Sequence, residues 1–114
     1  MSGGAVTQFD PLIHQPARLR IMAALSALGP GHEVEFSLLQ KALGFTPGNL
    51  GSHLRKLEAA GYIEVRKTFV QRRPRTYIRL TERGAQAFQG HVRALQALLH
   101  TPPPTSPPDP QDAI

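Results

Sequence analysis

The four residues Gly44–Phe45–Thr46–Pro47 constrain the fold most strongly, because they predict the end of one helix and the start of another. Glycine is common just after a helix C-terminus, since it adopts a left-handed backbone without a steric penalty. Threonine is a good N-cap residue, and proline fits the first helical position, whose N–H has no partner inside the helix. The sequence therefore predicts two helices separated by a tight turn of three or four residues.

Two helices and a very short strand are expected ahead of this turn. Residues 16–28 form one helix, because they begin with proline and their apolar residues recur at helical spacing. The apolar face of this helix consists of Ala17, Ile21, Ala24, Leu25 and Leu28. The sequence Gly-Pro-Gly at 29–31 ends it, and residues 32–36 then alternate like a strand. Ser37 and Gln40 match the capping-box pattern, which predicts a second helix opening at Ser37.

The helix after the turn is expected to run from residue 47 to residue 60 and to end at Gly61. Leu50, Leu54 and Leu57 recur on one face and should pack inward. Two helices joined by such a turn form a helix-turn-helix, whose second helix fits the major groove of DNA. The N-cap residue and the outward residues of the second helix are therefore the candidate DNA contacts: Thr46, Gly48, Asn49, Ser52, His53, Arg55 and Lys56.

Two of these candidates have a second interpretation. Gly48 costs roughly 1 kcal/mol of helix stability relative to alanine. Close approach to a phosphate would explain this glycine, and so would a surface position where glycine is merely tolerated. His53 lies beside Leu54, at the border between the buried and outward faces, so a packed histidine fits the pattern as well as a DNA contact.

After Gly61 the apolar residues alternate, which predicts a two-stranded antiparallel hairpin over residues 63–80. Its loop is expected at residues 70–75, with Pro74 at the loop end because proline cannot donate to a ladder of hydrogen bonds. The planar guanidinium group suits both phosphates and the narrow minor groove, so the candidate contacts in this loop are Arg72, Arg73 and Arg75. The alternative is an exposed loop that tolerates charge.

A long helix is expected from Thr81 and Glu82 to about residue 100. Its apolar residues step by three and four, like a short heptad seam: Ala85, Phe88, Val92, Leu95 and Leu99. The expected fold class is therefore mainly α with a small antiparallel β-hairpin. Residues 10–100 would form one domain, between a flexible N-terminus at 1–9 and a disordered, proline-rich tail at 101–114.

Basic residues outnumber acidic ones, with 13 Lys and Arg against 8 Asp and Glu and a net charge of +5. The basic residues concentrate in one stretch: Arg66, Lys67, Arg72, Arg73, Arg75, Arg79 and Arg83. Such a cluster is typical of proteins that bind nucleic acid, although a solvated surface would also carry it.

Several classes of protein are excluded by what the sequence lacks. It has no cysteine, no long apolar run, no secretory signal and no catalytic motif, and the spacing of its five histidines demands no metal site. We therefore expect a cytoplasmic protein that is not an enzyme, holds no metal or cofactor, and does not bind a membrane.

The order helix, helix, helix, hairpin, long helix resembles the winged helix-turn-helix regulators of the MarR/ArsR type. Residues 48–63, GNLGSHLRKLEAAGYI, are similar to their recognition helix and the turn after it. Residues 74–84, PRTYIRLTERG, are similar to the returning strand and the opening of the last helix. The family commonly has serine where this chain has Gly51, and the cysteine-bearing motif of its metal-sensing members is absent.

The resemblance implies a homodimer joined through its terminal helices. The candidate interface residues are Phe9, Leu12, Ile13, Phe88, Val92, Leu95 and Leu99. A two-fold dimer presents its recognition helices about 34 Å apart, so the operator is expected to be a near-palindrome in double-stranded DNA.

The leading hypothesis is a dimeric, sequence-specific transcriptional regulator that represses by occluding a promoter. One alternative is a winged-helix module that binds an acidic protein through its basic surface. The other is an architectural protein that binds DNA without sequence preference.

Overall fold

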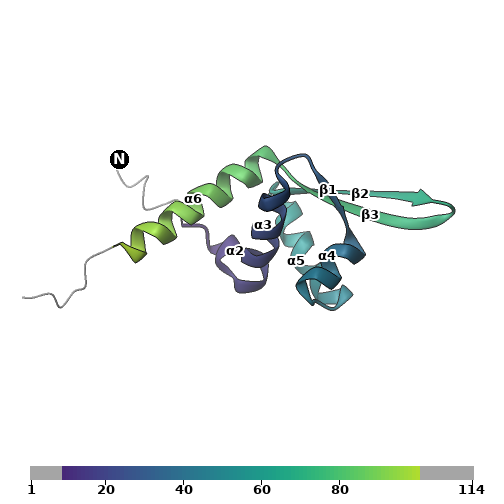
Figure 1. Ribbon diagram of the computed structural model, residues 1–114, viewed down its shortest axis with the longest axis horizontal. Helices are drawn as coiled ribbons and strands as arrows, with labels where there is room; N and C mark the ends of the chain where they lie inside the picture. The colour runs from purple at the N-terminus through teal and green to yellow at the C-terminus, as the bar shows by residue number, and fades with distance from the viewer. Residues whose placement is uncertain (1–8, 101–114) are drawn as a thin grey trace, which may run out of the picture.

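The computed structural model describes residues 9–100, which form a helical body with a long hairpin on one side (Figure 1). The elements in chain order are α2 (Pro11–His14), α3 (Pro16–Leu28), β1 (Glu33–Glu35), α4 (Phe36–Leu43), α5 (Pro47–Ala59), β2 (Ile63–Val70), β3 (Arg73–Leu80) and α6 (Glu82–Leu99). The expected fold class is confirmed. The N-terminal residues 1–8 and the proline-rich tail 101–114 lie outside the described residues. Between residues 9 and 100, no helix is long and apolar enough to cross a membrane.

The ends of α5 form as the sequence predicts. The Thr46 side chain accepts a hydrogen bond from the backbone N–H of Asn49 at 3.1 Å, which satisfies one of the free donors at the helix start. At the other end Gly61 has a φ of +80°, and the N–H of Tyr62 donates to the carbonyl of Leu57 at 3.0 Å. This closure is the Schellman type expected where glycine follows a helix.

The capping box predicted for α4 is wrong. The helix begins at Phe36 rather than Ser37, and its N-cap residue is Glu35, whose side chain makes no capping hydrogen bond. The Gln40 side chain instead donates to the carbonyl of Phe45 at 2.9 Å. Gln40 therefore stabilises the turn that follows the helix. Because the helix already begins at Phe36, the strand before it ends at Glu35, one residue earlier than its alternating pattern indicates.

The expected two-stranded hairpin is part of a three-stranded antiparallel sheet with the order β1-β3-β2. The loop predicted at 70–75 contains only Gln71 and Arg72, which have φ values of 51° and 67°. Two positive φ values are typical of the tight turns that match the twist of a hairpin. Arg73 and Arg75 consequently belong to β3, and Pro74 lies opposite Phe69, where β2 is the only neighbouring strand of β3.

Every described helix contributes to the core, together with β2 and β3. The buried apolar residues are Ile13, Ile21, Met22, Leu25, Leu39, Leu50, Leu54, Leu57, Ile63, Ile78, Leu80 and Ala85. The three leucines of α5 point inward as predicted. Leu28 was expected on the buried face of α3 but is 46% exposed, because it is the last residue of that helix.

The start of α6 is held against the junction between α5 and β2. Thr81 caps the helix as predicted, accepting a hydrogen bond from the N–H of Gly84, and its own N–H donates to the carbonyl of Tyr62. A Cβ atom on Gly84 would lie 2.1 Å from the carbonyl oxygen of Tyr62. Only glycine allows this close contact.

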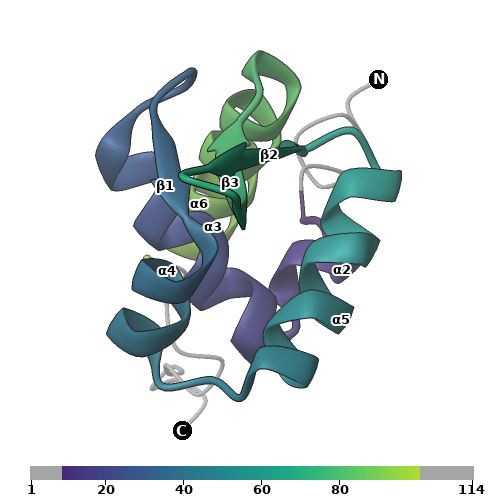
Figure 2. The ribbon, with the colours of Figure 1, turned by 90° about the vertical axis from the view of Figure 1, so that its right-hand side faces the viewer.

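The hairpin and the last helix extend from opposite sides of the body (Figure 1). Figure 2 looks along the hairpin and shows α4 and α5 below the sheet, joined by the turn at the lower rim. The helix-turn-helix and the hairpin thus leave α5 open to solvent on the side away from the core.

Candidate nucleic-acid interface

The outward face of α5 is exposed at its start and again at Arg55 and Lys56. Thr46, Gly48, Asn49, Arg55 and Lys56 are exposed, while Ser52 and His53 are half-buried. A Cβ atom on Gly48 would meet no atom within 4 Å, so packing within the described residues does not explain this glycine. The exposed residues of this face present hydrogen-bond donors and positive charge to the solvent.

His53 is turned toward the body of the protein. The guanidinium Nη1 of Arg18 lies 3.3 Å from its Nδ1, and its ring lies 6.1 Å from that of Phe45. Since arginine only donates, Nδ1 must accept, which leaves the ring proton on Nε2. Burial lowers the pKa of His53, and the positive charges of Arg18 and Lys56 lower it further. The packed alternative for this histidine is thus the one the contacts support.

Arginines of α3 fix the position of the helix-turn-helix. Arg18 also donates to the carbonyl of Leu12 at 2.7 Å, so it connects α2, α3 and α5. Arg20 donates to the carbonyl of Leu43 at 2.7 Å and lies over the ring of Phe45. This second bond satisfies a free carbonyl at the end of α4 and secures the turn that leads into α5.

A groove separates α5 from the inward face of the hairpin. It is lined by Phe36, Pro47, Gly51, Leu54, Arg55, Glu58, Val65, Lys67 and Thr76. Arg55 and Lys67 bring positive charge to it from the helix and from β2, respectively. We did not single out Lys67 from the sequence, although strand alternation places it on the same face as Val65.

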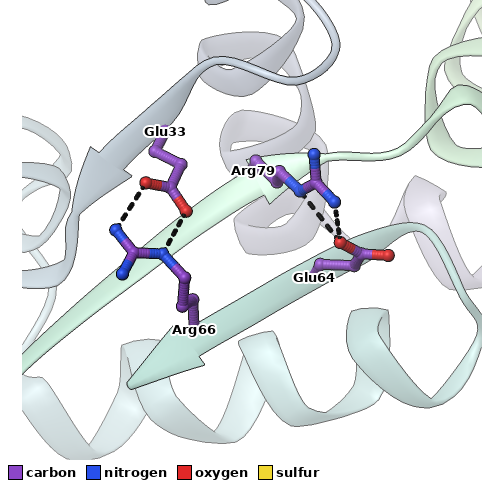
Figure 3. Close-up of polar contacts among 4 residues, drawn as sticks. All are labelled: Glu33, Glu64, Arg66 and Arg79. Atoms are coloured by element: carbon purple, nitrogen blue, oxygen red, sulfur yellow. Dashed lines mark hydrogen bonds and ion pairs between the residues drawn. The ribbon is translucent and has the colours of Figure 1, made fainter. Parts of the chain in front are cut away.

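The opposite face of the sheet carries a ladder of ion pairs at its base (Figure 3). Arg66 donates two hydrogen bonds of 2.8 Å to the carboxylate of Glu33, and Arg79 donates from Nε to Glu64 at 2.9 Å. The bond to Arg66 lowers the pKa of Glu33, and the same bond raises the pKa of Arg66. Arg66 also lies 4.7 Å above the ring of Tyr77.

The three arginines predicted to contact DNA from the hairpin are not equivalent. Arg75 lies in β3 and has its Nη1 atom 3.5 Å from the carboxylate of Glu35. Arg72 and Arg73 lie at the tip and are exposed, and no carboxylate of residues 9–100 lies within 4.0 Å of either. The available positive charge is therefore at the tip, whereas that of Arg75 is compensated.

The residues predicted for a dimer interface differ in their exposure to solvent. Phe9, Leu12, Phe88, Val92 and Leu95 are half-buried, and Leu99 is 81% exposed. Ile13 is wrong for such a surface, because its side chain is fully buried in the core of its own chain. Its position on one turn of α2 directs it inward, toward α3.

Asp10 anchors the N-terminal segment beside these residues. Its carboxylate accepts hydrogen bonds from the N–H groups of Leu12 and Ile13 and from the Tyr62 hydroxyl at 2.5 Å, and its own N–H donates to Nδ1 of His91 at 3.0 Å. Burial and the bond to Asp10 raise the pKa of Tyr62 to about 12. Burial lowers the pKa of His91, which is fully buried.

His14 and His91 lie side by side, with their nearest ring nitrogens 3.4 Å apart. A third ligand is missing: the part of the chain that the structure describes holds no group of three or more His, Cys, Asp or Glu placed to bind a metal ion. Because Nδ1 of His91 also accepts the hydrogen bond from Asp10, the pair is part of the anchor of the N-terminal segment.

Comparison with known proteins identifies the family and supports the fold. Residues 17–99 match a family model described as a winged helix DNA-binding domain. An uncharacterised protein of Methanocaldococcus jannaschii is 35% identical over 81 residues, which are 71% of this chain and 85% of that protein. The structure of a transcriptional regulator homologue from Pyrococcus horikoshii OT3 superposes with a TM-score of 0.70 and 35% identity, covering 77% of this chain and 84% of the other.

A more distant solved structure shares the fold alone. The zinc-responsive MarR family member ZitR of Lactococcus lactis shares the fold with a TM-score of 0.50 and 19% identity, over 70% of this chain and 52% of its own. The matched family model is that of a DNA-binding domain and the Pyrococcus structure is that of a transcriptional regulator homologue, so neither comparison points to an enzyme. The chain belongs to the winged-helix family of DNA-binding transcriptional regulators, and its fold is the MarR-like one that its motifs resemble.

Proposed function

We propose that this protein is a homodimeric, sequence-specific repressor of transcription that acts in the cytoplasm. In this proposal α5 enters the major groove, and the hairpin lies along the neighbouring stretch of double-stranded DNA. The observation that carries the proposal is the combination of an uncovered polar face on α5 with two arginines at the hairpin tip that no carboxylate of residues 9–100 neutralises.

The outward face of α5 suits contacts to base edges. Asn49 and Arg55 have side chains that form bidentate hydrogen bonds with adenine and guanine in the major groove. Both are exposed, and the buried leucines on the opposite face hold them on a rigid helix. Rigid presentation of such side chains favours recognition of a defined sequence over binding by charge alone.

The C-terminal half of α6 supports the dimer. Leu98 and Leu99 are 62% and 81% exposed, and Leu95 precedes them by one turn. An apolar stripe at the end of a helix that leaves the body is stabilised when a second copy covers it. A two-fold dimer would present two α5 helices to a near-palindromic operator and block a promoter without any further domain.

DNA recognition is tested by fluorescence anisotropy with the full chain. Its own promoter region and a random duplex of equal length are titrated at several salt concentrations. We expect at least tenfold tighter binding to the promoter fragment, and we expect Arg55→Ala to remove most of this preference. Arg93→Ala, an equal change of charge on the exposed side of α6, serves as the matched control. Equal affinity for both duplexes would contradict sequence specificity and favour an architectural role.

The dimer is tested by sedimentation velocity. Leu99→Glu should shift the protein toward monomer, because it introduces a charge into the apolar stripe. Gln96→Glu introduces the same charge at an exposed position of the same helix and should leave the dimer intact. A wild-type protein that sediments as a monomer at all concentrations would overturn this part of the proposal. A protein partner that stays bound in a pull-down after nuclease digestion would favour the interaction module instead.

A further inference from the structure

The hairpin tip carries an aromatic side chain in an unusual position. Phe69 is 73% exposed, while every other phenylalanine and tyrosine of residues 9–100 is at least half-buried. It belongs to the last part of β2 and pairs with Pro74 across the hairpin. The hairpin extends away from the helical body (Figure 1), in agreement with the high exposure of this side chain.

The surroundings of Phe69 are basic. Lys67 precedes it on the same face of β2, and Arg72 and Arg73 follow it around the turn. None of these three residues has an ion-pair partner within residues 9–100. Val70, on the other face, is 39% exposed and widens the apolar tip. An apolar point surrounded by uncompensated positive charge is complementary to a polyanion with an apolar interior, which is what stacked base pairs between two phosphate chains provide.

The direction of Phe69 fits that occupant. Strand alternation places it on the face of Ile63 and Val65, which is the face that turns toward α5 at the base of the hairpin. Four residues of strand carry it about 13 Å beyond Val65. The ring therefore projects past the groove beside α5, on the side where α5 is open to solvent.

We propose that Phe69 is a wedge that enters the minor groove, partly unstacks one base step and bends the DNA, while Arg72 and Arg73 hold the flanking phosphates. This inference rests on the proposed DNA binding and adds a deformation of the duplex to it. Proteins that insert apolar side chains from the minor groove unstack a step and kink the duplex by roughly 20–90°. The site then favours flexible steps such as TA, even though Phe69 forms no hydrogen bond to a base.

The test measures bending separately from binding. The full chain is titrated onto a promoter duplex that carries a donor and an acceptor dye at its ends and 2-aminopurine at the step expected beneath the tip. We expect wild-type protein to shorten the distance between the dyes and to raise the 2-aminopurine emission. Phe69→Ala should remove both signals and weaken binding by about tenfold. Phe69→Leu retains an apolar wedge and should keep most of both signals.

Leu28→Ala serves as the control, because it shortens an exposed apolar side chain on the body. Thermal unfolding of each variant checks that the fold is intact, which we expect for Phe69→Ala because its ring packs on little. Tight binding of wild-type protein without bending or 2-aminopurine emission would overturn the wedge and leave the proposed function standing. Phe69→Ala protein that retains both signals would do the same. Altered self-association of Phe69→Ala with unchanged DNA bending would assign the tip to a protein contact and also overturn the wedge.

Discussion

The base of the sheet and the tip of the hairpin both carry arginines, but they differ in what lies opposite them. At the base, Glu33, Glu35 and Glu64 each pair with one arginine. At the tip, Arg72 and Arg73 have no such partner among residues 9–100. All of these arginines come from one basic stretch of sequence, which by itself does not distinguish them.

The presence or absence of a carboxylate partner gives arginine a different role at the base and at the tip. Exposed ion pairs contribute little to stability, so the main effect of the pairs at the base is to cancel charge. Uncompensated arginines at the tip keep their charge for a phosphate. In the proposed complex, the attraction for DNA depends on where the charge lies, and less on the net charge of the chain.

The largest effect is expected from disrupting the packing between α6 and the start of β2, beside the base of the sheet, rather than from removing a charge there. Gly84→Ala would place a methyl group 2.1 Å from the carbonyl oxygen of Tyr62 and force apart α6 and the start of β2. We expect this change to lower the free energy of unfolding by about 3 kcal/mol. Urea denaturation measures it directly.

Gly48→Ala is the matched control, because the added methyl group meets open space. It should raise the free energy of unfolding by roughly 0.5–1 kcal/mol, the usual gain of alanine over glycine in a helix. Weakened DNA binding by this more stable variant would show that the backbone at Gly48 approaches a phosphate. Equal unfolding midpoints for the two alanine variants would contradict the close contact at Gly84.

The second largest effect is expected at the tip. Arg72→Asn together with Arg73→Gln should reduce the salt slope of DNA binding by about 1.8, since each lost phosphate contact accounts for about 0.9. Asparagine is chosen because it tolerates the positive φ of Arg72. The matched pair Arg66→Gln and Arg79→Gln removes the same charge from the base and should change the slope much less. The same loss of slope in both double variants would show that pairing does not matter, and the comparison of base and tip would fail.

The elements of the fold were largely predictable because their signals are local. Thr46, Gly61 and Thr81 begin or end helices within a few residues of themselves, and the period of the apolar residues distinguishes helix from strand. The two-residue turn was missed because Gln71 and Arg72 give none of the glycine, asparagine or aspartate signals that such turns usually carry.

The charge pattern of the site was less predictable because it depends on distant residues. Glu33 meets Arg66 only because β1 joins the edge of β3, and the residues next to Glu33 or Arg66 in the sequence give no sign of that pairing. Ile13 was assigned to a surface because a helix of one turn shows no period from which to infer its buried side. The outward face of α5 was predicted, and its contact with DNA remains a prediction.

A smaller effect is expected from a change of pH, which should alter the stability of the body through His91. The pKa of His91 is lowered by burial and by His14, an effect that Asp10 partly opposes. A folded-state pKa below the unfolded value of about 6.5 means that the unfolded chain takes up the proton first. The contribution of His91 is therefore complete above pH 6.5 and is lost as the pH falls below it.

Thermal unfolding between pH 8 and pH 5 measures this loss. His91→Asn keeps an oxygen where Nδ1 accepts the hydrogen bond from Asp10, cannot be protonated, and should flatten part of the profile. His53, whose pKa is also lowered, accounts for a further part. A wild-type midpoint that stays constant below pH 6.5 would contradict the assignment.

The smallest effect on DNA affinity is expected from leaving an arginine at the base of the sheet without its carboxylate partner. Glu33→Gln removes the carboxylate that neutralises Arg66 but retains a side chain of the same shape. Arg66 lies on the same sheet face as Arg73, closer to the body, so its released charge adds to the field around the DNA without reaching the tip. We expect affinity for any duplex to rise about two- to threefold, with the preference for the promoter sequence unchanged. Glu82→Gln is the matched control, because it removes an equal charge at the start of α6, far from the hairpin tip. If Glu33→Gln and Glu82→Gln raise affinity equally, the gain reflects net charge alone, and pairing at the base does not determine which arginines attract DNA.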